Sequence, residues 1–408
     1  MFSTLLQIIA ATAGISLQVD VRHDWIYSGS EVRDLAVNVS GPKSAAVTVD
    51  FNLVSDLSLM HSRDTVLSLS RTVHTGSDGK AVAHFPFNGI APGFYQVNLS
   101  AEDYSHPSFN IGIDSELIQS PADRQDDFDS FWEETLKELA GIPANVKLTE
   151  DPEASNELRT SYIVEATSLD GAKMGGYLCI PVKEGKYPVY IDYMGYGADC
   201  YKYNPSANPE AIEFLVSVRD QGIFRADNSR WIDRGLESKD TFYYRGAFCD
   251  AVRAVDIVCG LEKADTGRIF ARGESQGGAL TFAAAALDGR IRAAAPAVPF
   301  LCDYEDYSRI VEWPMWEVFA TADEMGLSRE ELFKTLSYFD IKNLADRIKC
   351  PVFMAFGLQD PTCPPHTNFS AYNLLRCDKQ FYCASVCGHA MWEVKEWAEI
   401  RQDWFKQF

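Results

Sequence analysis

The chain has 408 residues, 46% of them apolar and 23% charged, a globular composition with enough length for two domains. Its formal net charge of −21 repels phosphate backbones and anionic lipid, which argues against nucleic acid or a membrane as partner and favours a neutral substrate. The cysteines, all after residue 178, form no CxxC pair of the kind that binds zinc, and most are expected to be buried thiols; one or two disulfides stay open.

The first residues leave the compartment open. Residues 5–13 are mostly apolar and end in Ala11-Thr12-Ala13, which resembles a signal-peptide cleavage site, but no Lys or Arg precedes Arg22. The alternative is that they begin the first strand or form a disordered tail. A truncated signal peptide would favour a periplasmic or secreted protein; otherwise a cytoplasmic location is expected.

Residues 1–118 are predicted to form a small all-β domain. Short alternating runs separated by turn residues are typical of an immunoglobulin-like β-sandwich. Such runs occur at residues 16–21, 45–51, 81–87 and 93–99. The domain shows no catalytic constellation, so a packing role is favoured over a spacer or carbohydrate-contacting role.

The second predicted domain covers residues 119–408. A polar linker at 121–129 leads to an amphipathic helix over 131–139, for which Asp129 is the expected N-cap. From residue 158 onward, short apolar strands alternate with longer helical patterns. This alternation predicts an α/β fold with a mostly parallel sheet and helices on both faces.

The strongest local motif is Gly273-Glu274-Ser275-Gln276-Gly277-Gly278. It follows a β-like run at 268–271 and precedes an alanine-rich helical run at 279–287, so strand, tight turn and helix are expected in that order. Such a turn presents a serine hydroxyl at a helix N-terminus, and its glycines remove Cβ atoms that would collide. Ser275 is therefore the predicted nucleophile; an ordinary glycine-rich turn with a capping serine is the disfavoured alternative.

The general base should follow the nucleophile in the chain order of an α/β-hydrolase. Only His366 and His389 come after Ser275. His389 follows a strand pattern at 380–386 and is expected at the carboxyl edge of the sheet, so it is the predicted base. His366 is interpreted as a surface or capping residue at the start of a helix.

The acid that orients the base should also follow a strand. Asp360 comes just after the buried strand pattern at 351–357 and is the predicted orienting residue. Asp303 and Asp306 follow a strand that comes too early, so they are second choices, and otherwise solvated charges.

An oxyanion hole needs two backbone N–H groups. One is expected from Gln276, the residue after the nucleophile, and the other from the loop after an earlier strand, here Met194-Gly195-Tyr196-Gly197 after the run at 189–193. The triad generates its own nucleophile and no ligand cluster is apparent, so neither a metal nor a cofactor is expected.

Several separate stretches match the motifs of one enzyme family. They are Phe128-Asp129-Ser130-Phe131-Trp132, Tyr193-Met194-Gly195-Tyr196, the helix pattern at 241–254, Ser275-Gln276-Gly277-Gly278 and the acid loop at 357–365. Over residues 120–408 the chain thereby resembles the acetyl xylan esterase and cephalosporin C deacetylase family, carbohydrate esterase family seven, which has the α/β-hydrolase fold. The resemblance implies that Tyr196 supplies the second oxyanion N–H.

The resemblance also implies a small acetylated carbohydrate as substrate, with acetyl groups removed from short xylo-oligosaccharides, and a ring-like homo-oligomer. Arg219-Asp220-Gln221 stands where the family carries Arg-Gly-Gln, and Ala390 follows His389 where the family usually has Glu. These departures and the added β domain leave the substrate range and the oligomer open.

The segment 303–345 looks like a helical cap insertion. Trp313 and Trp316 within it could stack on a sugar ring, although core packing is the favoured interpretation. Two other functions stay open: a broad small-acyl carboxylesterase or serine peptidase with the same triad, and a non-catalytic carbohydrate-binding protein, against which the complete triad argues.

Overall fold

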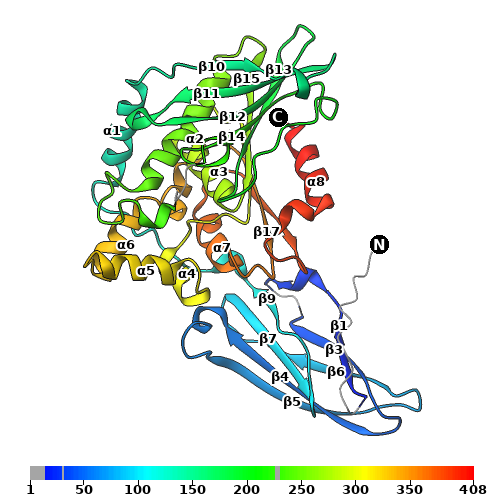
Figure 1. The fold of residues 1–408 in the computed structure, drawn as a ribbon. Coiled ribbons are helices and arrows are strands. Elements are labelled where there is room, and N and C mark those ends of the chain that lie inside the picture. The colour runs from blue at the N-terminus through cyan, green and yellow to red at the C-terminus, as the bar shows by residue number, and fades with distance from the viewer. Residues whose placement is uncertain (1–13, 30–31, 226–229) are drawn as a thin grey trace. The chain divides into compact units, whose positions relative to one another are not determined.

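The computed structural model describes residues 14–29, 32–225 and 230–408. The chain divides into two compact units, one ending at Ile118 and the other covering Gln119–Phe408 (Figure 1). The signal-like segment considered at residues 5–13 lies outside the described residues.

The first unit is built from two β-sheets. Its strands are β1 (Ser16–Val19), β2 (Ile26–Tyr27), β3 (Asp34–Ser40), β4 (Ala46–Ser55), β5 (Thr65–His74), β6 (Lys80–Pro86), β7 (Gly93–Ala101), β8 (Tyr104–Ser105) and β9 (Phe109–Ile113). One sheet has the order β1-β3-β6 and the other β2-β9-β7-β4-β5, with β8 paired to β7. Phe51 of β4 stacks on Phe85 of β6 with ring centroids 5.3 Å apart, so aromatic side chains join the two sheets.

The second unit contains a nine-stranded sheet of order β10-β11-β12-β14-β13-β15-β16-β17-β18. The strands are β10 (Lys147–Glu150), β11 (Arg159–Thr167), β12 (Lys173–Pro181), β13 (Tyr187–Tyr193), β14 (Ile212–Ser217), β15 (Ala264–Glu274), β16 (Ala293–Ala297), β17 (Val352–Gly357) and β18 (Lys379–Ala384). Neighbours from β14 to β18 are parallel, and those from β10 to β14 antiparallel. The sheet is thus mostly parallel, as predicted.

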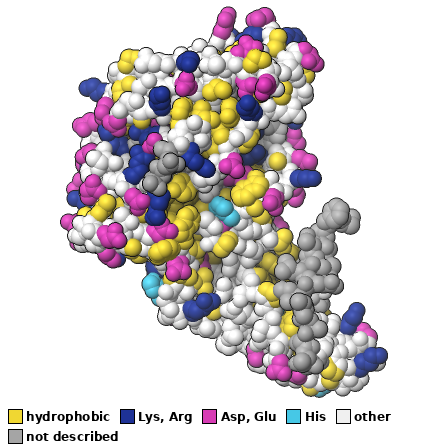
Figure 2. Space-filling view, viewed as in Figure 1, with side chains coloured by type: hydrophobic (Ala, Val, Ile, Leu, Met, Phe, Trp, Pro, Cys, Tyr) yellow, Lys and Arg dark blue, Asp and Glu magenta, His cyan; other side chains and the backbone are white. Residues whose placement is uncertain are grey.

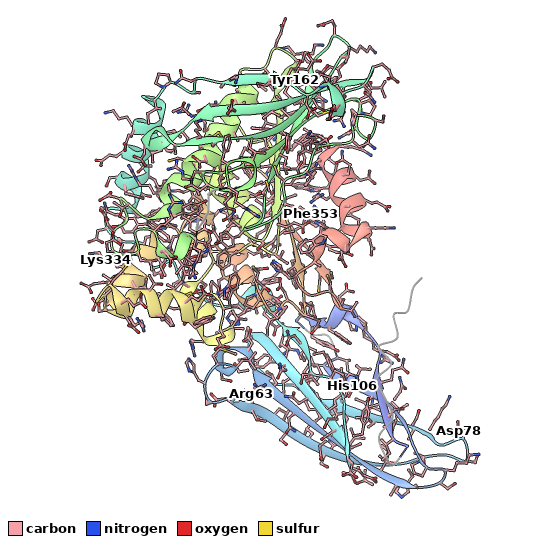
Figure 3. The ribbon with its side chains drawn as sticks, in the orientation of Figure 1. Arg63, Asp78, His106, Tyr162, Lys334 and Phe353 are labelled. Carbon is pink, nitrogen blue, oxygen red and sulfur yellow. The ribbon has the colours of Figure 1, made fainter. Side chains whose placement is uncertain are left out.

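Helices cover both sides of this sheet. They are α1 (Phe128–Ala140), α2 (Tyr243–Cys259), α3 (Gln276–Leu287), α4 (Tyr304–Ile310), α5 (Met315–Glu324), α6 (Arg329–Ser337), α7 (Pro365–Leu374) and α8 (Lys395–Phe405). α2 and α3 lie on one side and α8 on the other (Figure 1). Phe353 of β17 meets Trp397 and Trp404 of α8 at centroid distances of 4.9 and 5.5 Å (Figure 3). No helix of the described residues is long and apolar enough to span a bilayer.

Helix α1 begins earlier than its sequence suggested. The predicted cap at Asp129 is wrong, because the N-cap position is Asp127 and its side chain makes no capping hydrogen bond. The ring of Phe128 is buried and stacks on Tyr338 with centroids 6.1 Å apart, and this burial favours an additional turn at the start of the helix. Asp129 forms an ion pair with Arg347 instead.

The ten cysteines all lie in described residues and are free thiols. Four of them are buried and six are partly buried, so the prediction that most would be buried is wrong. The buried four are Cys179, Cys249, Cys302 and Cys363. The open possibility of a disulfide is not realised in this structure.

Candidate active site

Ser275 occupies the turn between β15 and α3. Its backbone angles, φ 59° and ψ −121°, fall where residues with a side chain rarely occur. The N–H of Ser275 donates to the carbonyl of Ala297 (3.1 Å), and its own carbonyl accepts from the N–H of Phe300 (3.1 Å). The neighbouring strand β16 and the segment after it therefore hold the strained turn in place.

The glycines around Ser275 permit the close approach of strand and helix. A Cβ on Gly273 would lie 2.5 Å from the carbonyl oxygen of Gly277. One on Gly277 would lie 2.0 Å from the carbonyl oxygen of Tyr193, and one on Gly278 2.6 Å from that of Ala297. These neighbours are backbone atoms that cannot rotate away, so only glycine fits at these positions. The motif thus has the geometry of a nucleophile elbow.

Asp360 and His389 form a hydrogen-bonded pair. Nδ1 of His389 lies 2.8 Å from Oδ2 of Asp360. The other carboxylate oxygen, Oδ1, accepts the backbone N–H groups of Thr362 (2.7 Å) and Cys363 (2.9 Å). Asp360 is buried, whereas the His389 side chain remains 23% exposed. The carboxylate is fixed by its loop, and the imidazole keeps one side open to a substrate.

The acid and histidine loops lie against each other after β17 and β18. The N–H of Gln359 donates to the carbonyl of Cys387 (2.9 Å). A Cβ on Gly357 would lie 2.0 Å from the carbonyl oxygen of Gly388, so the approach of the two loops depends on glycine there. The carboxyl ends of adjacent parallel strands therefore bring Asp360 and His389 together, as expected for this class of sheet.

A buried thiol connects this pair to the nucleophile. The side chain of Ser275 lies close enough to the Cys363 thiol to lower the pKa of that thiol. One side-chain atom each from Asp360, Cys363 and His389 lie within 4.8 Å of one another. The structure thus gathers Ser275, Asp360 and His389 around Cys363, which sequence reasoning missed; its only signal was its position three residues after Asp360.

The protonation of this cluster follows from burial and from the hydrogen bond between Asp360 and His389. Burial, reinforced by the charge of Asp360, raises the pKa of Cys363 well above its ordinary value, so the thiol stays protonated. Nδ1 of His389 is already engaged by Asp360. Nε2 of His389 is therefore the ring nitrogen left to exchange a proton with Ser275.

The side chain of Gln276 is buried in a polar network beneath the elbow. Its Oε1 accepts hydrogen bonds from Nε2 of Gln221 (3.0 Å) and from the hydroxyl of Tyr244 (3.0 Å), and its Nε2 donates to the carbonyl of Met194 (3.4 Å). This network fixes the first residue of α3, whose backbone N–H is the predicted oxyanion donor.

The loop after β13 lies beside the nucleophile. A Cβ built on Gly195 would lie 4.0 Å from Cβ of Ser275, so Tyr196, the next residue, is in the neighbourhood expected of an oxyanion donor. The Tyr196 side chain is partly buried, and this burial raises the pKa of its phenol, which therefore stays neutral at physiological pH.

Asp220, which stands where the family motif has glycine, is accommodated by the backbone. Asp220 has a φ of 60°, the left-handed conformation in which Asp is better tolerated than most residues with a side chain. Its carboxylate pairs with Arg234 (2.6 Å). The flanking residues keep structural roles: Arg219 binds the carboxylate of Asp250 through two nitrogens (2.9 and 2.7 Å), and Gln221 contacts the elbow network.

The rival candidates belong to another buried cluster. His366 is 4% exposed in α7, whose N-cap is Pro364, so its interpretation as a surface or capping residue is wrong. Asp303 is also buried and pairs with Lys342 (2.9 Å), so it is not a solvated charge. Asp306 is partly buried, and this burial raises the pKa of its carboxyl group. These predictions failed because packing in the folded chain buries polar residues that the local sequence pattern places at the surface.

Exposed tryptophans were likewise misjudged. Figure 2 shows hydrophobic side chains gathered on one face of the second unit. Trp313 and Trp316 are 43% and 52% exposed, so their assignment to core packing is wrong; α5 buries Met315 and Val318 instead. Trp392, which drew no prediction, is 63% exposed and meets the ring of His389 edge to face, with centroids 6.2 Å apart.

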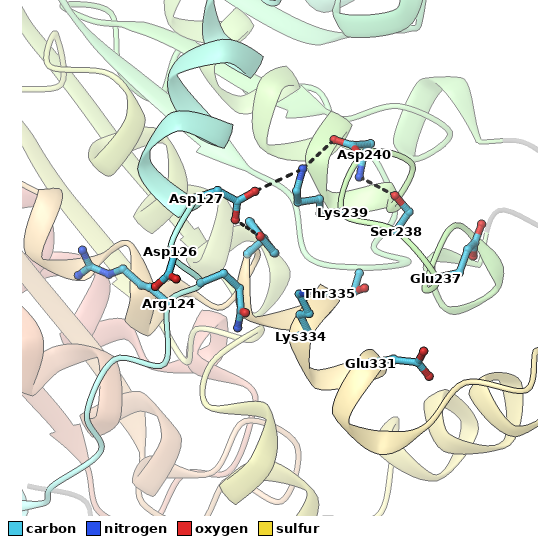
Figure 4. Close-up of a pocket in the computed structure, with 12 residues that line it drawn as sticks. Arg124, Asp126, Asp127, Glu237, Ser238, Lys239, Asp240, Glu331, Lys334 and Thr335 are labelled. Atoms are coloured by element: carbon cyan, nitrogen blue, oxygen red, sulfur yellow. Dashed lines mark hydrogen bonds and ion pairs between the residues drawn. The ribbon is translucent and has the colours of Figure 1, made fainter.

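An open pocket of about 640 Å³ lies elsewhere in the second unit (Figure 4). Its lining comes from the segment before α1, the loop before α2, and helix α6, and includes no member of the predicted triad. Lys239 in this pocket pairs with Asp127 (3.8 Å) and Asp240 (3.3 Å). Its lining offers no histidine to activate a nucleophile, so it does not compete with the site around Ser275.

The second unit is similar to known acetyl esterases. The model of the family described as acetyl xylan esterase (AXE1) matches residues 116–406. The acetyl esterase Axe7A of Xylanibacter ruminicola is 26% identical over 340 residues, which cover 78% of this chain and 74% of that protein. The solved acetyl xylan esterase of Paenibacillus sp. R4 superposes with a TM-score of 0.67 at 30% identity, covering 72% of this chain and 98% of that one. Acetyl xylan esterase 1 of Thermoanaerobacterium sp. JW/SL YS485 gives a TM-score of 0.64 at 28% identity, with 70% and 96% covered.

Proposed function

Because the chain belongs to the acetyl xylan esterase family, we propose that it removes acetyl groups from acetylated xylo-oligosaccharides and similar small sugar esters. The enzyme class is that of a carboxylic ester hydrolase with an α/β-hydrolase fold. The observation that carries the proposal is the 2.8 Å contact between His389 and Asp360 beside the strained Ser275 turn. These three residues have the relative roles that acyl transfer needs.

In the proposed mechanism, Nε2 of His389 takes the proton of the Ser275 hydroxyl while the serine oxygen attacks the acetyl carbonyl carbon. Asp360 accepts the hydrogen bond from Nδ1–H and stabilises the imidazolium. The negative charge that develops on the carbonyl oxygen is met by the backbone N–H groups of Gln276 and Tyr196; losing one such donor typically costs about 10²–10³-fold in rate.

The tetrahedral intermediate then collapses with cleavage of the bond to the sugar oxygen. The imidazolium of His389 gives its proton to that oxygen, so the sugar leaves as an alcohol and an acetyl-Ser275 ester remains. Water, deprotonated by His389, attacks the acetyl ester, and acetate leaves as Ser275 recovers its proton. No external cofactor enters this balance.

The test compares the wild type with Ser275→Ala on acetylated xylo-oligosaccharides, p-nitrophenyl acetate and p-nitrophenyl octanoate. Ser238→Ala, in the pocket away from the triad, is the control for a serine substitution. We expect acetate release from the sugar that depends on Ser275 and little octanoate cleavage. Full activity of Ser275→Ala would refute the mechanism. Cleavage of the simple esters without sugar deacetylation would keep the triad and discard the carbohydrate substrate, leaving a broad carboxylesterase.

A further inference from the structure

Trp392 stands out as an exposed aromatic residue beside the proposed base. At 63% exposure it is the most exposed of the eight tryptophans. An indole in water forgoes the stabilisation that its burial would give, although a single exposed apolar residue is ordinary on a protein surface. Exposure alone therefore decides nothing; the role of Trp392 depends on how the residue is held and on what its ring faces.

The backbone of Trp392 is fixed on both sides. It lies in a short 3₁₀ turn, Met391–Glu393, in which the Met391 side chain is buried and the Met391 N–H donates to the carbonyl of His389 (2.9 Å). The backbone of Trp392 lies close enough to the partly buried carboxyl group of Glu274, the residue before the nucleophile, to lower the pKa of that group. The turn is thus tied to both the base and the elbow, while the indole ring projects into solvent.

The indole ring lies on the side of the site where the leaving alcohol is expected. The indole meets His389 edge to face, with a centroid distance of 6.2 Å and an interplanar angle of 86°. In the proposed mechanism His389 returns its proton to the oxygen of the leaving alcohol. A group in contact with this imidazole therefore lies on the side of the leaving alcohol, whereas the acyl group faces the oxyanion donors.

We propose that Trp392 is a subsite residue for the sugar ring that carries the acetyl ester. This inference rests on the proposed function, since the sugar is then the leaving alcohol. The face of an indole carries negative charge density and attracts the C–H groups that cover one face of a pyranose ring. A fixed aromatic surface with one side in solvent suits a pyranose ring better than it suits a small or strongly charged alcohol.

The experiment compares two esters that share the acetyl group and differ in the leaving alcohol: acetylated xylobiose and methyl acetate. The variants are Trp392→Ala, Trp392→Phe and, as control, Val386→Ala, which truncates another exposed apolar side chain of the same loop (57% exposed). For Trp392→Ala we expect the ratio of kcat/KM on the sugar ester to that on methyl acetate to fall roughly three- to tenfold, mostly through KM. Trp392→Phe should recover part of the ratio, and Val386→Ala should keep it.

Equal losses of Trp392→Ala on both esters would overturn the inference, because they would mean that the indole only supports His389. An unchanged ratio would overturn it as well. Should the wild type cleave methyl acetate but not the sugar ester, the proposed function itself fails and the subsite with it. Thermal melting of each variant separates these outcomes from a loss of fold, and Trp392→Phe keeps the test decisive if the alanine variant is unstable.

Discussion

Replacing Asp360 with asparagine should remove most of the esterase rate while the fold survives, because the structure decides which way the new amide points. Oδ1 of Asp360 accepts the N–H groups of Thr362 and Cys363, at 2.7 and 2.9 Å. An amide NH₂ group at the position of Oδ1 would face two N–H donors, so the amide oxygen must occupy that position. The NH₂ group then points at Nδ1 of His389, which lies 2.8 Å from the other oxygen in the wild type. The imidazole must carry its proton on Nε2 and cannot accept one from Ser275.

The expected magnitude follows from the loss of the working tautomer. That loss costs about 10⁴-fold in kcat in serine hydrolase triads, or about 5.4 kcal/mol at about 1.36 kcal/mol per tenfold. The assay is kcat for p-nitrophenyl acetate at neutral pH, with thermal melting to show that the variant is folded. Asp306→Asn is the matched control, since it makes the same exchange in a partly buried carboxylate outside the triad.

The reasoning would be refuted if Asp360→Asn kept more than about a tenth of the wild-type kcat. It would also be refuted if Asp306→Asn lost as much activity, since the effect would then belong to the general charge of the region rather than to the tautomer of His389.

Three further changes test the surroundings of the site. Gly277→Ala should lower the melting temperature and kcat, because the new Cβ would lie 2.0 Å from a backbone oxygen; the expected loss of stability is about 1–3 kcal/mol or more. Gly289→Ala is the control and should leave the melting temperature unchanged, since no atom lies within 4 Å of its new Cβ. Asp250→Ala should cost about 3–5 kcal/mol in urea titration, since it leaves the buried Arg219 only the longer, exposed pair with Asp170 (3.8 Å), and a loss below about 1 kcal/mol would contradict this. Burial raises the pKa of the Glu274 carboxyl group above its ordinary 4.5, so the native state binds the carboxyl proton more tightly than the unfolded chain does. The wild type therefore loses stability as pH rises from 4.5 through the raised pKa. Glu274→Gln lacks this loss, so its melting temperature should gain on the wild type as pH rises above 4.5, and a difference that does not change with pH would contradict the assignment.

The loops that carry the candidate site could be predicted from sequence because their order follows a rule of parallel sheets. β15, β16, β17 and β18 are neighbours in the sheet in the same order as in the chain, so the loops after them meet at one edge. A local motif located Ser275, and strand patterns located Asp360 and His389 relative to that edge. The structure brings the latter two within hydrogen-bond distance, which spacing alone could not guarantee.

The errors share a different cause, which is contact between residues far apart in the chain. Helix α1 begins early because Phe128 packs against Tyr338, and no local pattern contains that partner. His366 is buried by its surroundings in the fold, although its own segment resembles an exposed helix start. Cys363 lies close to His389 only because the acid and histidine loops meet. Trp392 lies three residues after His389, but the local sequence does not show that its ring stays exposed beside the imidazole.

The division between sheet and loops also indicates where substrate range can change. A residue with the backbone angles of Ser275 costs about 1–3 kcal/mol and persists only where its surroundings over-determine it. Here the constraint comes from β13, β16 and the buried Gln276 network, which belong to the core, so changes in the elbow risk the fold and the rate together. The Trp392 side chain, on the turn Met391–Glu393, takes no part in holding Ser275 and is 63% exposed beside the His389 ring. We therefore expect substitutions at such loop positions to change the preference for the leaving alcohol, while the nucleophile and its oxyanion donors stay unchanged.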